Sequence, residues 1–492
     1  MVDRQNDTRA SSAAQVKFPP RILLIVLLVS LPLLNPWVRG DGVGYYAFAR
    51  ALLIQHNLDF APDYEHANAG FREARLDPTG IPKQEFRTVN GHLDNHFTVG
   101  PAMLWAPFLL IAHAGVLTLR AFGAHVSADG FSLPYLIAMA FGTLVYGFAA
   151  LLLSYRVACR LVAQRWALLA TIAIWWASSL PVYMYFNPSW SHAHSAFAVA
   201  LFFWYWLRTR GERTVAQWFA LALFAGVMMN VYYPNALVLA LLVPEAVADY
   251  RAALQRLQGN SQKVVASLFG RHFLFCAVVL VSLMPTFLTR YFVYGGFLET
   301  GYVPISRWAW RSPWFLALLF SANHGLFSWT PLLLIATAGL FLFWRRFPAI
   351  GISVICVLIV FYYFMASYPD WTGISSYGNR FFVSLTVFFV LGLATALDAI
   401  ASHFRSRELA SALLGSTLSI FIIWNVGLMF QWGMHLIPAR GPVSWSVVAQ
   451  NQFHEVPKQI VGQLRSYLFR RADALHQIEQ RDIEQLRHSM QR

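Results

Sequence analysis

The side chains best suited to chemistry in this 492-residue sequence occur in short polar runs beside long apolar segments. The first is Asp41, which follows an apolar segment ending at Val38 and is flanked by Gly40, Gly42 and Gly44. Glycines allow tight backbone turns and the close approach of another molecule. A carboxylate at a lipid–water boundary is partly desolvated, so it accepts a proton more readily, as a general base must. We therefore take Asp41 as the candidate catalytic base, with a capping residue at a helix end as the alternative.

A second polar run, residues 370–380, ends in a candidate phosphate ligand. Arg380 directly precedes another apolar segment. Its planar guanidinium matches the oxygens of a phosphate group, and the alternative role is contact with lipid headgroups. Trp371 and Tyr377 from the same run are candidates for contacts with a substrate, with anchoring at the membrane interface as the alternative for Trp371.

The remaining candidates lie in other polar runs that we expect on the same side of the membrane. Histidine and arginine contact anions through their N–H groups, although a lone histidine more often has a structural role. His192 and His194 do not share a helical face, so we predict no metal site and no firm cofactor, and leave a divalent cation open. The further phosphate candidates are Arg290, His324 and His96, and the further substrate contacts are Tyr45, Tyr46, His192 and Tyr233.

The composition indicates what kind of protein positions these residues. Hydrophobic residues make up 57% of the chain and charged residues only 12%, whereas soluble domains carry about 25% charged residues. The apolar residues form blocks of about 15–25 residues, a length that spans a bilayer. The net charge of +14 lies mostly in short loops between these blocks, where it orients a membrane protein and does not indicate nucleic-acid binding.

The arginine-rich loops predict the topology of the chain. The segment 97–119 contains two prolines, and counting it as a full span would place two arginine-rich loops outside. We therefore expect an interfacial or re-entrant helix there, and an all-α polytopic fold of about 11 transmembrane helices. The predicted parts are a cytoplasmic tail (1–20), a transmembrane domain (21–431, with a first outward loop at 39–130) and an outward helical tail (432–492). The segments expected outside are 39–130, 187–193, 232–235, 295–325, 368–380 and the tail from about 432.

The first outward loop is much longer than a connector requires, which is typical of a functional loop. Eight of the 23 acidic residues fall between Asp41 and Asp94. Residues 45–55 have an amphipathic pattern, so we expect a helix lying along the membrane interface. The tail 455–492 is also expected to be helical, with one apolar face packed on its own domain or on the membrane.

Four stretches of the sequence resemble the GT-C superfamily of membrane glycosyltransferases. The similar members depend on polyprenyl-phosphate sugars, as the protein O-mannosyltransferases and the lipid A aminoarabinose transferase do. The four stretches follow one another in the same order over most of the chain. They are 40–50 (GDGVGYYAFAR), 95–108 (NHFTVGPAMLWAPF), 321–331 (SANHGLFSWTP) and 371–381 (WTGISSYGNRF).

The resemblance implies an inverting transfer of a sugar from a polyprenyl-phosphate donor to a hydroxyl group on a glycan, lipid or protein. It gives Asp41 the role of base or acceptor organiser, and it places a residue such as Arg380 near the donor phosphate. The implied location is a bacterial inner membrane, with the site on the periplasmic face. Two departures stand out: relatives often have a lysine where Asn95 and His96 stand here, and an acidic residue where this chain has 191–194 (SHAH).

Two other functions remain as alternatives. A transporter or flippase for lipid-linked sugars would show internal repeats and ionisable residues near the membrane midplane, whereas the acidic residues here cluster in one outward loop. An O-antigen ligase or polymerase has a similar number of spans but has its largest outward loop late in the chain. Here the longest loop comes first, which favours the GT-C interpretation.

Overall fold

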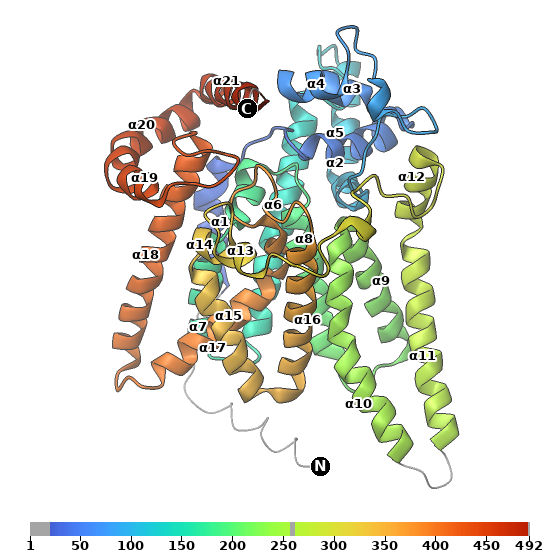
Figure 1. Cartoon of the computed structure of the whole chain (residues 1–492), viewed down its shortest axis with the longest axis vertical. Helices are drawn as coiled ribbons and strands as arrows, with labels where there is room; N and C mark the ends of the chain where they lie inside the picture. The colour runs from blue at the N-terminus through green and yellow to red at the C-terminus, as the bar shows by residue number, and fades with distance from the viewer. Residues whose placement is uncertain (1–19, 256–260, 491–492) are drawn as a thin grey trace.

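The computed structural model describes residues 20–255 and 261–490, so the predicted cytoplasmic tail lies almost wholly outside the described residues. The described residues form helices, turns and two isolated β-bridges, Leu76–Pro82 and Arg87–Leu93. The predicted all-α class is thereby confirmed. Long helices run roughly along the vertical axis of Figure 1, and shorter helices gather at its upper end.

The α-helices are, in chain order, α1 (Arg21–Ser30), α2 (Gly42–Arg50), α3 (Ala61–Glu65), α4 (Ala69–Arg75), α5 (Gly100–Ala121), α6 (Leu133–Ala158), α7 (Gln164–Trp176), α8 (His192–Thr209), α9 (Val215–Val231), α10 (Leu242–Gln255), α11 (Ser261–Ser282), α12 (Met284–Tyr294), α13 (Phe315–Phe320), α14 (Leu326–Trp329), α15 (Leu332–Arg346), α16 (Pro348–Ser367), α17 (Thr386–Ala401), α18 (Arg407–Gly433), α19 (Trp445–Gln450), α20 (Val456–Phe469) and α21 (Arg471–Met490). Shorter 3-10 or π-helical segments used below are η2 (Ala51–Gln55), η4 (Val182–Phe186), η5 (Tyr233–Leu241), η7 (Arg380–Leu385) and η8 (Asn451–Glu455).

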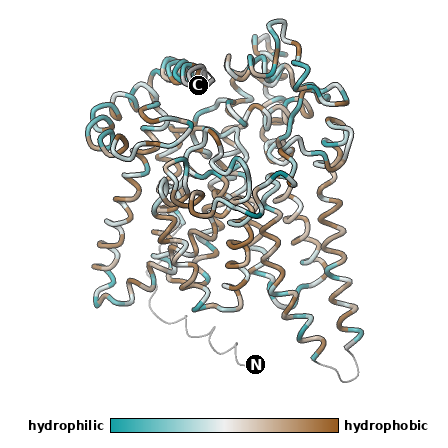
Figure 2. The backbone as a smooth tube through the Cα atoms, in the orientation of Figure 1, coloured by the Kyte–Doolittle hydropathy of each residue, from teal (hydrophilic) through white to brown (hydrophobic). Residues whose placement is uncertain are grey.

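Within the described residues, six helices are long and apolar enough to cross a membrane. They are Gly100–Ala121, Leu133–Ala158, Gln262–Ser282, Pro348–Ser367, Arg380–Ala401 and Arg407–Gly433. Figure 2 shows that hydrophobic residues dominate the long helices, whereas hydrophilic residues are frequent over the upper end. The chain is therefore a multi-pass helical membrane protein.

The predicted eleven spans are not eleven continuous helices. The apolar block 166–186 is split between α7 and η4, with Pro181 directly before η4. The block 234–248 begins as the 3-10 segment η5, which has Pro234 in its first turn. Proline lacks the N–H that continues an α-helix, so these blocks bend or change helix type where the hydropathy pattern alone predicts one span.

Helix α5 covers most of the segment 97–119, for which we expect an interfacial or re-entrant helix. It is a continuous helix of 22 residues despite Pro107 in its interior, and its length and composition would allow it to cross a membrane. Figure 1 nevertheless labels α5 beside α2 at the upper end of the molecule, away from the middle of the long helices. Its interfacial placement stays a prediction.

Segments that the sequence assigns to the outward face meet at the upper end of Figure 1. The amide nitrogen of Asn90 donates to the carbonyl oxygen of Phe292 at 2.9 Å. From the C-terminal tail, the Tyr467 hydroxyl donates to the carbonyl oxygen of Leu33 at 2.9 Å. The first loop is therefore packed on α12, and the C-terminal tail is packed on the end of the first apolar segment.

Helix α2 differs from the expected interfacial helix, because every residue of it is buried within the protein. The ring of Tyr45 packs on Phe97, with centroids 4.7 Å apart, and the ring of Tyr46 packs edge-on against Trp105 at 6.2 Å. The apolar side chains of α2 are therefore covered by other parts of the protein and not by lipid. Burial fixes α2, and therefore the residue that precedes it, as part of a rigid core.

Candidate active site

Asp41 and Arg380 form an ion pair. The Arg380 Nη2 lies 2.8 Å from the Asp41 Oδ2, and the two side chains are 12% and 29% exposed, respectively. Asp41 directly precedes α2, and Arg380 begins η7. The two strongest sequence candidates, from opposite parts of the chain, are thus in direct contact.

Close packing against the segment 187–191 fixes the position of Asp41. Gly40 has a φ of +58°, a conformation that glycine adopts without strain, and a side chain there would collide with the ring of Trp190. A side chain at Gly42 would overlap the hydroxyl of Ser189. The indole nitrogen of Trp190 also donates to the carbonyl oxygen of Arg39 at 2.9 Å. The glycines next to Asp41 therefore allow the close approach of the segment 187–191 of the same chain.

Arg380 is held between an aromatic ring and a tight turn. Its guanidinium carbon lies 4.6 Å from the ring centre of Trp190, a cation–π distance. Before it, the Ser376 hydroxyl donates to the carbonyl oxygen of Gly378 at 2.7 Å. The Nε of Arg380 is buried and has no hydrogen-bond acceptor among the described residues. Arg380 can therefore donate to a further anionic group without leaving its position.

Tyr377 helps to support this turn and does not contact the ion pair. Its side chain is fully buried, and its hydroxyl donates to the Asn425 Oδ1 of α18 at 2.8 Å. Its backbone N–H donates to the hydroxyl of Tyr183 at 3.1 Å. We therefore assign Tyr377 to positioning Arg380, and no longer to contact with a sugar. Trp371 from the same run is partly exposed and accepts a hydrogen bond from Asn379 through its carbonyl oxygen.

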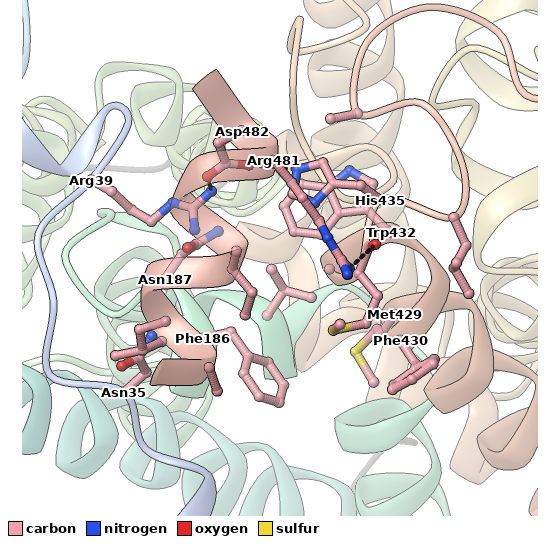
Figure 3. A pocket seen from close by; sticks show the side chains of 18 of the residues that line it. Asn35, Arg39, Phe186, Asn187, Met429, Phe430, Trp432, His435, Arg481 and Asp482 are labelled. Atoms are coloured by element: carbon pink, nitrogen blue, oxygen red, sulfur yellow. Dashed lines mark hydrogen bonds and ion pairs between the residues drawn. The ribbon is translucent and has the colours of Figure 1, made fainter. Parts of the chain in front are cut away.

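A large cavity of about 1360 Å³ adjoins the ion pair. It lies among the end of α1, η4, the upper part of α18 and the C-terminal helices α20 and α21. Figure 3 shows Arg39, Arg481 and Asp482 towards one side of it and Phe186, Met429 and Phe430 towards the other. Asp41 and Arg380 are not among its lining residues, but Gly40 precedes Asp41, Trp190 contacts the guanidinium of Arg380, and Ser375 lies five residues before Arg380. Arg440, which also lines the cavity, interacts with Asp41 through its charge.

Arg440 is a cationic residue of this cavity that the sequence interpretation missed. Burial lowers the pKa of its guanidinium, and the carboxylate of Asp41 acts in the opposite direction. This interaction places a second positive charge in the electrostatic field of Asp41. Arg440 lies in the segment between α18 and α19, and its sequence surroundings (LIPARGP) gave no signal that distinguishes it from other loop arginines.

Two of the predicted histidines lie near the ion pair. The His192 ring packs 4.6 Å from the ring of Tyr183, and its Nδ1 is buried without a partner among the described residues. The His324 ring is stacked on Trp329 at 4.8 Å. Burial, and next the charge of Arg380, lowers the pKa of His324 to about 4. His324 is therefore neutral at physiological pH and can contact an anion only as a hydrogen-bond donor.

The other predicted phosphate ligands form a separate cluster. The guanidinium of Arg290 donates to the carbonyl oxygens of Asn95 and Phe97 at 3.0 and 2.6 Å, and to the hydroxyl of Tyr233. His96 lies 3.9 Å from Asp94. Because carbonyl groups of its own chain occupy its N–H groups, we assign Arg290 to holding the loop before α5 rather than to binding phosphate. The hydroxyl of Tyr233 accepts a hydrogen bond from the same arginine.

The two tyrosines after Asp41 have different surroundings. Burial, and next the charge of Asp41, raises the pKa of the Tyr45 hydroxyl, so this hydroxyl remains protonated. Tyr45 therefore lies within the field of the ion pair. The Tyr46 hydroxyl donates instead to the carbonyl oxygen of Gly130 at 2.6 Å and fixes the far end of the first loop. Both side chains are buried, so their contact with a substrate stays a prediction.

Within the described part of the chain, no group of three or more His, Cys, Asp or Glu side chains is arranged to hold a metal ion. The chemistry that the residues themselves can provide is one carboxylate, a buried guanidinium with a free N–H, and a second guanidinium nearby. This set suits binding a phosphate group and accepting a proton.

Comparison with known proteins gives a distant likeness in fold to solved structures. No protein-family model and no curated protein matches the sequence. A solved structure, the archaeal oligosaccharyltransferase AglB from Archaeoglobus fulgidus in complex with an inhibitory peptide and a dolichol-phosphate, is similar with a TM-score of 0.46 and 13% identity. The match covers 84% of this chain and 55% of AglB, so the chain spans about half the length of that protein.

Proposed function

We propose that this chain is an inverting membrane glycosyltransferase. It moves a sugar from a polyprenyl-phosphate carrier to a hydroxyl acceptor on the non-cytoplasmic face of the membrane. The observation that carries the proposal is the Asp41–Arg380 ion pair near the large cavity. The carboxylate can accept a proton, the guanidinium can bind a phosphate group, and the cavity offers apolar side chains for a lipid. The sequence resemblance to GT-C glycosyltransferases supports the same function.

The cavity suits the two parts of a lipid-linked donor. Its apolar residues, such as Phe186, Met429 and Phe430, can hold part of a polyprenyl chain. The phosphodiester would then lie towards Arg440 and Arg380. Negative charge grows on the phosphate as the bond to the sugar breaks, and fixed cations at that position lower the barrier.

The proposed reaction uses Asp41 as the base. The acceptor oxygen attacks the anomeric carbon of the sugar, and the bond between that carbon and the phosphate oxygen breaks with inversion. Polyprenyl phosphate leaves with the bonding electron pair, and Asp41 takes the proton of the acceptor hydroxyl. A well-placed base typically contributes on the order of 10²–10⁴ in rate, or about 3–5 kcal/mol of barrier.

The ion pair suggests how donor binding prepares the base. In this structure the Nη2 of Arg380 pairs with the carboxylate of Asp41. A donor phosphate would compete for the same guanidinium, and the carboxylate would then lose part of its electrostatic partner. Asp41 becomes a better proton acceptor only when the donor is in place, which favours transfer over unproductive hydrolysis. Tyr45, His192 and Trp371 are the proposed contacts for the sugar or acceptor.

The proposed setting is a bacterial inner membrane, with residues 21–431 as the transmembrane transferase domain and the site on the periplasmic face. Glycolipids, cell-envelope glycans and proteins remain the acceptor classes. The experiment is mass analysis of envelope glycolipids and glycoproteins from cells that lack the chain and from cells that express wild-type or variant protein. A product that disappears with the chain and returns with wild type identifies both the sugar and the acceptor.

Asp41→Asn should abolish this product at unchanged protein abundance. Arg380→Ala should reduce it strongly, and Arg380→Lys should restore a part because it keeps the charge without the planar fork. The matched control is Asp398→Asn, which breaks the 2.6 Å ion pair of Asp398 with Arg346 elsewhere in the fold. A wild-type amount of product from Asp41→Asn would refute the proposal. Loss of product from Asp398→Asn would show that breaking an ion pair anywhere in the fold reduces the product by disturbing folding.

A further inference from the structure

Helix α20 carries an apolar stripe that faces away from the protein. Val461, Leu464 and Leu468 are 74%, 43% and 37% exposed, and with Pro457 they recur at intervals of three or four residues. Residues at this spacing form a single face of an α-helix. Phe469, at the end of the same helix, is 80% exposed. A stripe of this kind in contact with water would be unfavourable, so something apolar should cover it.

The opposite face of α20 is fixed to the rest of the protein. Gln459, Ile460, Gln463 and Tyr467 line the large cavity, and Leu464, which also lines it, lies at the border between this face and the stripe. Just after the helix, Arg471 donates to the carbonyl oxygen of Leu34 at 2.8 Å. These contacts determine the rotation of α20 about its own axis, so the apolar stripe cannot turn inward without losing them.

The stripe continues the lipid-facing surface of a candidate membrane span. The segment η8, which leads directly into α20, packs on α18, where a side chain at Gly427 would collide with Gln452. On the same part of α18, Ile420 and Ile423 are 68% and 67% exposed, as expected for side chains that contact lipid. Figure 1 places α19 and α20 beside the upper end of α18. The membrane that surrounds α18 therefore ends near the level of α20.

Basic residues border the apolar stripe. Lys458 and Arg465 are seven residues apart and therefore flank the stripe on one side, and Arg470 follows the helix. Lys458 is paired with Glu455 at 3.4 Å, whereas Arg465 and Arg470 form no ion pair with any other residue in the described part of the chain. Apolar residues flanked by cations are the composition of helices that lie in the surface of a membrane with anionic lipids.

We infer that α20 is an interfacial helix that binds anionic phospholipid headgroups in the leaflet next to the site. The stripe lies among the upper acyl chains, and Arg465 and Arg470 extend to phosphate groups. This inference does not depend on the proposed transferase activity. It has a consequence for the cavity, because the inner face of α20 forms part of the cavity wall and is thereby held at the membrane surface.

The test uses the full chain in lipid nanodiscs, with the three native cysteines replaced by serine and a single bimane-labelled cysteine introduced. Val461→Cys places the label on the stripe, and Gln477→Cys is the matched control on an exposed position of α21. Phosphatidylcholine brominated in the upper acyl chain quenches bimane on contact. We expect at least twofold stronger quenching at 461 than at 477, and equal quenching at the two positions would overturn the inference.

The lipid preference is tested with the same label at 461. Brominated phosphatidylglycerol, supplied as one fifth of the lipid in unbrominated phosphatidylcholine, should quench more strongly than the same fraction of brominated phosphatidylcholine. The double variant Arg465→Gln/Arg470→Gln should remove this difference while quenching by brominated lipid in general remains. Equal quenching by the two lipids in the protein with both arginines would refute the anionic preference, and so would a difference that survives the double substitution.

Discussion

If Arg380 is shared between Asp41 and a donor phosphate, removing the carboxylate should tighten phosphate binding while transfer is lost. Asp41→Asn keeps the size of the side chain but no longer competes for the guanidinium. The two charges are partly buried at 2.8 Å, which gives an attraction of about 6 kcal/mol at an effective dielectric constant near 20. Desolvation and side-chain ordering offset most of this attraction, and about 1–2 kcal/mol remains.

That remainder corresponds to about 5–30-fold in an equilibrium constant. We therefore expect Asp41→Asn to bind polyprenyl phosphate about 5–30-fold more tightly than wild type, as measured by calorimetric titration of the purified protein in detergent. Asp398→Asn should leave the affinity unchanged. Raising the salt concentration should weaken binding in all three proteins. Unchanged or weaker binding by Asp41→Asn would refute the idea that carboxylate and phosphate share Arg380, even if the variant is inactive.

Three further outcomes follow from the packing around the site. Gly42→Ala should lower the free energy of unfolding by about 1–3 kcal/mol, because its methyl group would overlap Ser189; an unchanged thermal midpoint would contradict this packing. Asp482→Asn removes the carboxylate that pairs with Arg39, so limited proteolysis should cut the C-terminal tail faster while the core of the protein stays intact. The low pKa of His324 means that the unfolded chain binds a proton that the folded protein excludes between pH 6.5 and about 4. Stability should therefore fall by up to about 3 kcal/mol over this range, and less in His324→Asn, whose side chain tolerates the same positive φ.

The sequence predicted the class of the fold well because composition and block length depend on the bilayer itself. It did not predict which apolar blocks form continuous helices. An apolar block such as 166–186 has the length of a span, but hydropathy does not reveal that the chain bends before Pro181. Likewise, the apolar pattern of α2 is equally suited to lipid and to protein, and only packing shows that the helix is buried.

For the site, the sequence singled out Asp41 and Arg380 separately, from their glycine-rich and membrane-edge surroundings. Their direct pairing could not be predicted, because it depends on how distant segments pack. Arg290 shows the opposite case: its position near the outer end of an apolar block suggested an anion ligand. Its acceptors are backbone carbonyl groups, for example that of Phe97, which carry no sequence signal. Arg440 was missed because its sequence surroundings do not distinguish it from other loop arginines.

The distance in sequence between Asp41 and Arg380 has a consequence for biogenesis. During synthesis Asp41 leaves the ribosome early, whereas Arg380 emerges only after most of the other helices. Until then the carboxylate lacks its countercharge, and a partly inserted chain cannot catalyse transfer by the proposed route. Premature termination anywhere before residue 380 would thus yield an inert fragment rather than an unregulated enzyme.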